Sequence, residues 1–243
     1  MINNIDDLRI KIFADGAEKK GMLEMYAKSY IQGFTTNPTL MRKSGISDYR
    51  LFARDILQLI PDKPISFEVF SDDFDEMEKQ ALEIASWGKN VYVKVPITNT
   101  KGEQSIALVK KLSENGVKVN VTAILTLDQV RDVVLNVAPE TSCFISVFAG
   151  RIADTGRDPV PAMAAAVELL KLKPNAELIW ASPRELLNII QADHIGCHVI
   201  TVTNDILKKL ELRGKDLREY SLDTVKMFYK DASEARFDLN KSL

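Results

Sequence analysis

Lys94 is the residue most suggestive of chemistry, because it interrupts an otherwise apolar, β-type stretch at residues 91–96. A strand that is apolar on both faces is usually buried inside an α/β protein. A lysine in such a strand must find a partner or lose its proton, and a neutral lysine is a nucleophile that forms a Schiff base with a carbonyl carbon. The alternative is a strand-end lysine that extends into solvent. Taken alone, the stretch favours this alternative, since buried lysines are rare.

Other side chains with chemical potential lie at the ends of similar stretches along the chain. They are Asp15, Asn37, Glu68, Asn120, Thr122, Ser146, Arg151, Ser182 and Arg184. Each one alone fits a polar turn, and Glu68 alone fits an interior partner for Lys94. Together they supply an amine, carboxylates, amides, hydroxyls and a pair of guanidinium groups. That combination predicts Schiff-base carbon–carbon chemistry on a phosphorylated carbonyl compound.

Eight β-type stretches, each followed by a helical stretch, must position these side chains. The stretches are Arg9–Ala14, Gly33–Thr36, Ile65–Phe70, Asn90–Val95, Val117–Ile124, Ser142–Phe148, Glu177–Ala181 and His198–Thr203. Eight βα units predict an α/β fold of the TIM (β/α)8 barrel type, as one domain over residues 1–243. The C-terminal ends of barrel strands carry the chemistry, and the polar residues fall there. A doubly wound open sheet is the alternative fold, although no glycine-rich phosphate loop follows the first stretch.

An extra C-terminal helix is predicted over Ser221–Arg236, with Ser221 as its N-cap and Asp223 in its first turn. Its apolar stripe is Leu222, Val225, Phe228, Tyr229 and Ala232. A barrel closes its own core with eight units, so something else must cover this stripe. We expect a second copy of the chain to cover it, which predicts a homo-oligomer. The alternative is a helix that folds back on its own barrel.

Composition excludes several classes of protein. The 243 residues are 46% hydrophobic with a net charge of −2, and no basic stripe indicates nucleic acid or an anionic membrane as partner. We find no apolar run long enough to span a membrane and no signal-peptide pattern at the N-terminus, which predicts a cytoplasmic protein. Cys143 and Cys197 are interpreted as buried thiols. His194 and His198 are the only histidines and have no cluster of other ligands nearby, so we expect neither a metal nor another cofactor.

Five ordered motifs resemble the transaldolase family, specifically its short-chain branch, which also includes the fructose-6-phosphate aldolases. The matching segments are Phe34-Thr35-Thr36-Asn37-Pro38-Thr39, Val93-Lys94-Val95-Pro96-Ile97-Thr98, Asn120-Val121-Thr122, Gly150-Arg151-Ile152 and Ala181-Ser182-Pro183-Arg184. The resemblance runs from about Ile10 to Asp205, nearly the whole predicted barrel. The combination of Thr-Thr-Asn-Pro with a later Val-Lys-Val-Pro is specific, so we favour a buried, reactive Lys94.

The resemblance implies a role for each candidate residue. Lys94 corresponds to the Schiff-base lysine, and Asp15 to the carboxylate that takes the proton from the C4 hydroxyl. Glu68 corresponds to an acid/base that works through a water, which Thr122 helps to place. The residues expected to hold the dihydroxyacetone unit are Asn37, Asn120 and Ser146. The residues expected to hold the phosphate are Arg151, Ser182 and Arg184.

Two positions separate the branches of this family. Fructose-6-phosphate aldolases carry glutamine and tyrosine where this chain has Glu68 and Phe148, which is the transaldolase pattern. A carboxylate can shuttle protons whereas an amide cannot. The alternative for Phe148 is plain barrel packing. The chain also departs from the family at Gly16, where relatives more often have threonine or serine, and at Pro183, where many have phenylalanine. These departures bear on the acceptor and on the phosphorylated end of the substrate.

The resemblance therefore implies a transaldolase of the pentose phosphate pathway. It would move a dihydroxyacetone group from fructose 6-phosphate or sedoheptulose 7-phosphate to an aldose phosphate, as a homo-oligomer of five or ten subunits. The first alternative is a lyase of the same family that releases free dihydroxyacetone. A second alternative is a catalytically silent barrel that serves as a scaffold, which the presence of Lys94 and Asp15 disfavours. The two histidines disfavour a metal-dependent aldolase.

Overall fold

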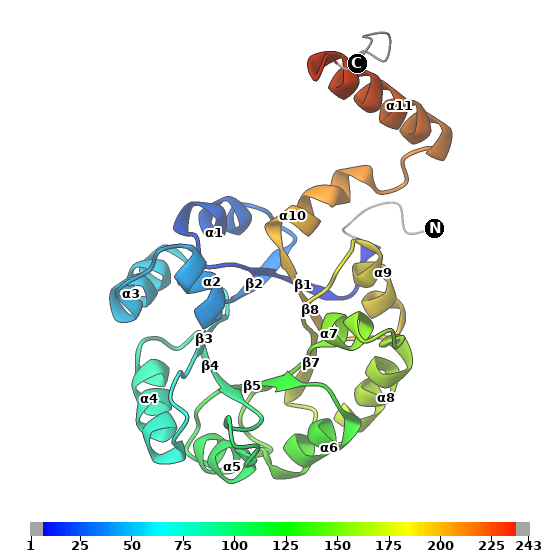
Figure 1. Cartoon of the computed structure of the whole chain (residues 1–243). Coiled ribbons are helices and arrows are strands. Elements are labelled where there is room, and N and C mark those ends of the chain that lie inside the picture. Colours follow the sequence, from blue (N-terminus) through cyan, green and yellow to red (C-terminus); the bar gives the residue numbers. More distant parts are fainter. Residues whose placement is uncertain (1–6, 237–243) are drawn as a thin grey trace.

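The computed structural model describes residues 7–236, and its strands close into a barrel ringed by helices (Figure 1). The strands are β1 (Lys11–Asp15), β2 (Ile31–Thr35), β3 (Ile65–Glu68), β4 (Val91–Pro96), β5 (Val119–Ile124), β6 (Cys143–Val147), β7 (Ala176–Trp180) and β8 (Val199–Thr203). All pairings are parallel and follow the order of the chain, and β8 pairs with β1 to close the ring. The prediction of a TIM barrel is confirmed, and the open sheet is excluded.

At least one helix follows each strand along the chain, and all helices but the last lie around the barrel (Figure 1). They are α1 (Lys19–Tyr26), α2 (Pro38–Lys43), α3 (Tyr49–Leu59), α4 (Phe74–Ser86), α5 (Ile106–Glu114), α6 (Leu127–Asn136), α7 (Ala149–Asp154), α8 (Val160–Leu170), α9 (Leu187–His194), α10 (Asn204–Leu207) and α11 (Leu217–Glu234), with a 3-10 helix η2 (Lys208–Leu212) before α11. Side-chain caps begin several of them: Asp48 accepts a hydrogen bond from the Leu51 amide, and Asp73 from the Glu76 amide.

The inner face of the barrel has an apolar floor. Phe13, Phe144, Ile179 and Val199 form a buried cluster there, against which Tyr92 packs. The rings of Phe13 and Phe144 meet edge to face with centroids 5.6 Å apart, and Tyr92 stacks on Phe144. Side chains two residues further along each strand point to the same face but lie nearer the C-terminal end. Those positions are polar on β1, β4, β6 and β8, with Ala181 on β7 as the apolar exception, so the floor supports a largely polar layer above it.

Strand β2 begins at Ile31, before the predicted Gly33, because this glycine lies inside the strand rather than in a turn. A Cβ at Gly33 would come within 2.5 Å of the Phe13 ring. Glycine is therefore needed at position 33 so that the backbone of β2 can lie this close to the Phe13 ring in the barrel floor. Elsewhere the observed strands overlap the predicted ones and differ only near their ends.

The predicted N-cap of the C-terminal helix is wrong. Helix α11 begins at Leu217, and Asp216 caps it by accepting hydrogen bonds from the amides of Arg218 and Glu219. Aspartate and serine are both good N-caps, so the pattern alone did not separate Asp216 from Ser221. The helix extends away from the barrel (Figure 1), and none of its residues is buried. It does not fold back on its own barrel.

Within residues 7–236, no helix combines the length and apolarity that a bilayer crossing requires. The same residues hold no group of three His, Cys, Asp or Glu side chains arranged to bind a metal ion. Cys143 and Cys197 are buried and not disulfide-bonded, and burial raises the pKa of each thiol to about 12. Both thiols are therefore unreactive at neutral pH. Residues 1–6 of the N-terminal segment, where we found no signal-peptide pattern, lie outside the described residues.

Candidate active site

A cavity of about 570 Å³ opens at the C-terminal ends of the strands. Its volume is in the range of small-molecule sites. The predicted site residues that line it are Asp15, Asn37, Glu68, Lys94, Thr122, Ser146, Arg151, Ser182 and Arg184. Asn120 is the one predicted site residue that does not line the cavity. The cavity is also lined by residues that we did not predict, among them Thr35, Lys43 and Thr201.

Lys94 lies at the base of this cavity, where its side chain is only 7% exposed. Its Nζ is 3.0 Å from Oε2 of Glu68 and donates a hydrogen bond of 2.9 Å to the carbonyl oxygen of Thr36. Lys94 and Glu68 are register partners on neighbouring strands, so the strand pairing itself brings the amine and the carboxylate together. The alternative of a lysine that extends into solvent is wrong.

Asp15 accepts a hydrogen bond from a threonine beside the place where β8 and β1 close the barrel. Thr35 donates a hydrogen bond of 2.7 Å from its hydroxyl to Oδ1 of Asp15, and the Thr35 hydroxyl also contacts that of Thr201 on β8. Removal from bulk water raises the pKa of Asp15, although the charge of Lys94 and the Thr35 hydrogen bond oppose this and Glu68 adds to it. A carboxyl group whose pKa is raised by burial is suited to general acid–base work.

A chain of hydrogen bonds lies beneath the cavity. The Ser146 hydroxyl donates to Oδ1 of Asn120 over 2.7 Å, and Nδ2 of Asn120 donates to the Ser66 hydroxyl over 3.0 Å. All three residues are buried, and of them only Ser146 lines the cavity. Asn120 therefore orients Ser146 from below and does not itself line the space for a substrate.

Thr122 presents a hydroxyl that makes no hydrogen bond to the described residues, although it is buried and lines the cavity. Buried hydroxyls without partners are rare in proteins, so we expect a bound molecule to satisfy this one. The next residue, Ala123, also lines the cavity and has a positive φ of 62°. Non-glycine residues seldom adopt this conformation, and those that do gather at functional sites.

The rim of the cavity is cationic. The guanidinium of Arg151 lies 5.3 Å from the centre of the Phe148 ring. Lys43 approaches the same cavity from α2. Ser182 has a positive φ of 58°, and a Cβ at Gly150 would come within 1.5 Å of the Ser182 carbonyl oxygen. Only glycine at position 150 therefore lets the start of α7, which carries Arg151, lie against Ser182.

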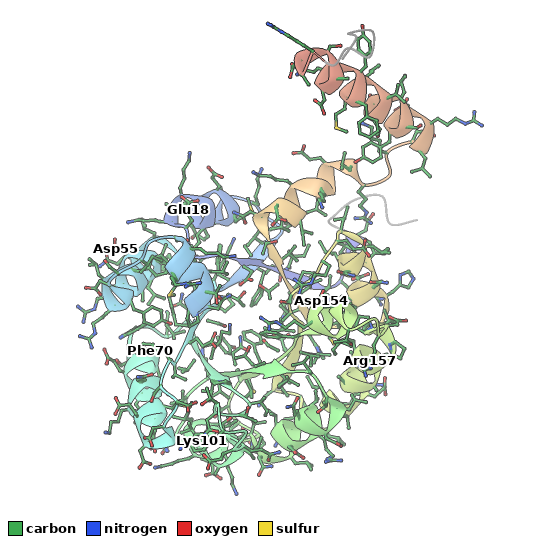
Figure 2. All side chains as sticks on the ribbon, in the orientation of Figure 1. Glu18, Asp55, Phe70, Lys101, Asp154 and Arg157 are labelled. Atoms are coloured by element: carbon green, nitrogen blue, oxygen red, sulfur yellow. The ribbon has the colours of Figure 1, made fainter. Side chains whose placement is uncertain are left out.

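Arg184 is paired with Asp154 at this rim. Its Nε donates to Oδ1 of Asp154 over 2.9 Å, and its Nη2 contacts Oδ2, so the pair is bidentate. Asp154 lies on α7 (Figure 2), and both side chains are about half exposed. The hydrogen bonds from Arg184 lower the pKa of Asp154. A guanidinium held in this way keeps part of its fork for another anion at the cavity.

The cavity thus differs in chemistry between its bottom and its mouth. One amine lies between carboxylates at the bottom of the cavity, while guanidinium groups line its mouth. A carbonyl compound with a distant phosphate fits such a gradient. Thr35 and Thr201 could have been predicted as site residues, because each carries a hydroxyl near the C-terminal end of a predicted strand. The sequence pattern did not predict that their two hydroxyls contact each other.

Comparison with known proteins bears on this geometry. A family model for transaldolase/fructose-6-phosphate aldolase matches residues 12–242. A probable transaldolase from Dehalococcoides mccartyi is 34% identical over 202 residues, which are 83% of this chain and 90% of that protein. A probable transaldolase from Clostridium acetobutylicum is 35% identical and covers 83% of this chain and 89% of its own length. The 3-hexulose-6-phosphate synthase of Salmonella typhimurium has a TM-score of 0.56 at 15% identity, covers 82% of this chain and 91% of its own, and shows the fold alone.

Proposed function

Because the chain belongs to the transaldolase/fructose-6-phosphate aldolase family, we propose that it transfers a dihydroxyacetone group between sugar phosphates through a Schiff base on Lys94. Family membership makes the protein an enzyme of the transferase or aldolase class. The donors in our proposal are fructose 6-phosphate or sedoheptulose 7-phosphate, and the acceptor is an aldose phosphate. The observation that carries the proposal is the buried amine of Lys94. It lies 3.0 Å from the Glu68 carboxylate, at the base of a cavity whose mouth is lined by guanidinium groups.

In the first proposed step, the Lys94 ammonium gives a proton to Glu68, and the neutral Nζ attacks the ketone carbon of the donor. Glu68 gives this proton to the carbonyl oxygen, takes a second proton from the attacking nitrogen and gives that one to the hydroxyl of the carbinolamine. The hydroxyl leaves as water, and an iminium ion remains. The ion pair between Glu68 and Lys94 supports this role, since proton transfer needs hydrogen-bond reach. The unpartnered Thr122 hydroxyl supports a role in holding the water that carries the proton.

In the second proposed step, Asp15 takes the proton from the C4 hydroxyl of the donor. The C3–C4 bond breaks, its electron pair moves toward the iminium nitrogen, an aldose phosphate leaves, and an enamine remains on Lys94. Carbon C3 of the enamine then attacks the acceptor aldehyde, and Asp15 returns its proton to the new hydroxyl. The raised pKa of Asp15 supports this cycle, because burial makes its carboxylate a better proton acceptor than a carboxylate in water.

Release of free dihydroxyacetone is the second candidate function. We favour transfer because Phe148, which lines the cavity beneath the Arg151 guanidinium, offers no hydroxyl to place water at the enamine. With fructose 6-phosphate and erythrose 4-phosphate together, we expect sedoheptulose 7-phosphate to form rapidly. With fructose 6-phosphate alone, free dihydroxyacetone should appear much more slowly. Efficient release of dihydroxyacetone from fructose 6-phosphate without any acceptor would make the protein a lyase.

Borohydride trapping tests the covalent step. Incubation with fructose 6-phosphate and borohydride should add a reduced three-carbon adduct to the peptide that contains Lys94. Lys94→Arg should give no adduct, because a guanidinium is not a usable nucleophile at neutral pH. Lys118→Arg is the matched control, since Lys118 is a partly buried lysine outside the cavity that donates to the carbonyl of Lys89. An adduct on any other lysine would refute the proposal.

A further inference from the structure

The end of strand β3 departs from the regular pattern of a parallel sheet. Strand β2 pairs with β3 only at Phe34 with Ile65 and at Thr35 with Ser66. The Thr36 amide still donates to the Ser66 carbonyl, over 3.1 Å. In an evenly spaced parallel ladder, the Thr36 carbonyl would next accept a hydrogen bond from the Glu68 amide. That bond is replaced: the Thr36 carbonyl accepts from Nζ of Lys94 instead.

Tyr49 occupies the place that the Thr36 carbonyl has left. Its hydroxyl accepts a hydrogen bond of 2.8 Å from the Glu68 amide and donates one of 2.9 Å to the Glu68 carbonyl. One hydroxyl therefore satisfies both backbone groups of Glu68, which would otherwise lack partners on this side. Burial raises the pKa of the Tyr49 hydroxyl, so at neutral pH it keeps the proton that it donates.

The Tyr49 ring is fixed from outside the barrel. Tyr49 is the first residue of α3, after the N-cap Asp48, and its ring meets those of Phe67, Phe70 and Trp87 at steep angles with centroids 5.7–6.2 Å apart. Phe70 lies on the outer side of the barrel between α3 and α4 (Figure 2). The aromatic group thus holds the hydroxyl against the backbone of Glu68 while the carboxylate of Glu68 faces the cavity.

We infer that Tyr49 is a positioning residue for the Lys94–Glu68 pair, a role that rests on the proposed function. Its hydroxyl takes over the ladder contact at Glu68, which leaves the Thr36 carbonyl to Lys94 and fixes the Glu68 carboxylate beside the amine. Tyr49 is absent from the residues that line the cavity, so it acts only through Glu68 and Thr36. Without the hydroxyl, the Glu68 amide is free to recapture the Thr36 carbonyl and draw it away from Lys94.

Tyr49→Phe is the test, because it removes the hydroxyl and keeps the ring that packs on Phe67 and Trp87. We expect the single-turnover rate of borohydride-trapped adduct formation to fall about tenfold, the effect of one ordinary hydrogen bond. KM for fructose 6-phosphate should change less than twofold, since Tyr49 does not touch the substrate. In a Glu68→Gln background, the same change should lower the rate less than twofold, because the group that Tyr49 positions has lost its proton chemistry.

Two controls separate the hydroxyl from general packing. Tyr26→Phe removes a hydroxyl that donates to Asp62, away from the cavity, and should leave the rate unchanged. Trp87→Phe perturbs the same aromatic group without removing a hydrogen bond to Glu68, and should lower the rate less than Tyr49→Phe does. Circular dichroism checks that each variant is folded.

The outcomes are distinguishable. An unmodified protein that forms no adduct with any ketose phosphate would refute the proposed function itself. An unmodified protein that forms the adduct, with Tyr49→Phe equally fast, would overturn the positioning role alone. A tenfold loss that persists unchanged in the Glu68→Gln background, or that Trp87→Phe reproduces, would also overturn it, because the effect would then come from packing.

Discussion

The ion pair between Arg184 and Asp154 leads to a quantitative prediction for Arg184→Ala. In our proposal the guanidinium of Arg184 contacts the phosphate of the donor sugar at the rim of the cavity. A charge-assisted hydrogen bond of this kind contributes about 1.5–3 kcal/mol. Its loss should lower kcat/KM for fructose 6-phosphate by about 10- to 150-fold, because each 1.4 kcal/mol corresponds to a factor of ten. The loss should lie mainly in KM.

The folded state should be little affected by the same change. The carboxylate left behind, Asp154, is exposed to water, and pairs as exposed as this one contribute little to stability. The melting temperature of Arg184→Ala should therefore match that of the unmodified protein. Arg131→Ala is the matched control, since Arg131 is similarly exposed and pairs with Asp128 and Asp132 on α6, away from the cavity.

The assay compares each protein with fructose 6-phosphate and with unphosphorylated fructose, at a fixed concentration of acceptor. Arg184→Ala should lose activity strongly with the first donor and by less than threefold with the second. Arg131→Ala should behave as the unmodified protein with both. Equal losses with the two donors would refute the reasoning, because Arg184 would then serve the fold through Asp154 and not the phosphate.

Three further predictions follow from other parts of the molecule. Asp15→Asn should abolish transfer yet raise the melting temperature at neutral pH. The raised pKa of Asp15 means that the unfolded chain loses its proton first, so folding stability falls as pH rises from about 3.8 through the folded pKa. Gly150→Ala should lower kcat/KM for phosphorylated donors as Arg184→Ala does, because the new Cβ would collide with the Ser182 carbonyl. Removal of α11 by truncation after Gly214 should reduce the mass measured by light scattering to that of one chain, since we propose that the exposed stripe of α11 joins subunits of a pentamer or decamer.

Each of these has a result that would contradict it. Asp15→Asn would speak against a buried carboxylate if its melting temperature stayed equal to that of the unmodified protein at pH 7 and at pH 4. Gly150→Ala would show that the rim tolerates a shift if both donors reacted normally. If the truncated protein kept the full assembly mass, α11 would not be part of the interface. If the full-length protein were already a monomer, the prediction of a homo-oligomer would be wrong.

The barrel itself was predictable because its signal is local and repeated. Each strand is a short apolar run followed by helical spacing, and eight such units leave few topologies. The position of the site was predictable for the same reason: parallel strands bring their C-terminal ends to one face, so Lys94 and Glu68 had to lie near each other. Their roles remain predictions from the family resemblance.

The remaining contacts depend on register and helix packing, which the pattern does not encode. Tyr49 begins a helix and reads as an ordinary apolar anchor, and only the early departure of β2 from the sheet makes its hydroxyl a partner of Glu68. Asn120 carries the right chemistry but lies one layer too deep to line the cavity. Arg184 was expected at the rim, whereas its pairing with Asp154 requires α7 to lie beside the end of β7.

The closure of the barrel between β8 and β1 also determines when, during synthesis, the site can form. Asp15 comes from the first strand, and the threonine that holds it touches Thr201 on the last. Of the eight strands, the ribosome makes β1 first and β8 last. A nascent chain therefore contains Lys94 and Glu68 long before Asp15 has its full set of partners. In our proposal, the carbon–carbon cleavage centre is thus assembled only when β8 joins β1. Chains cut short before β8 would contain the amine and yet lack a completed proton-handling site.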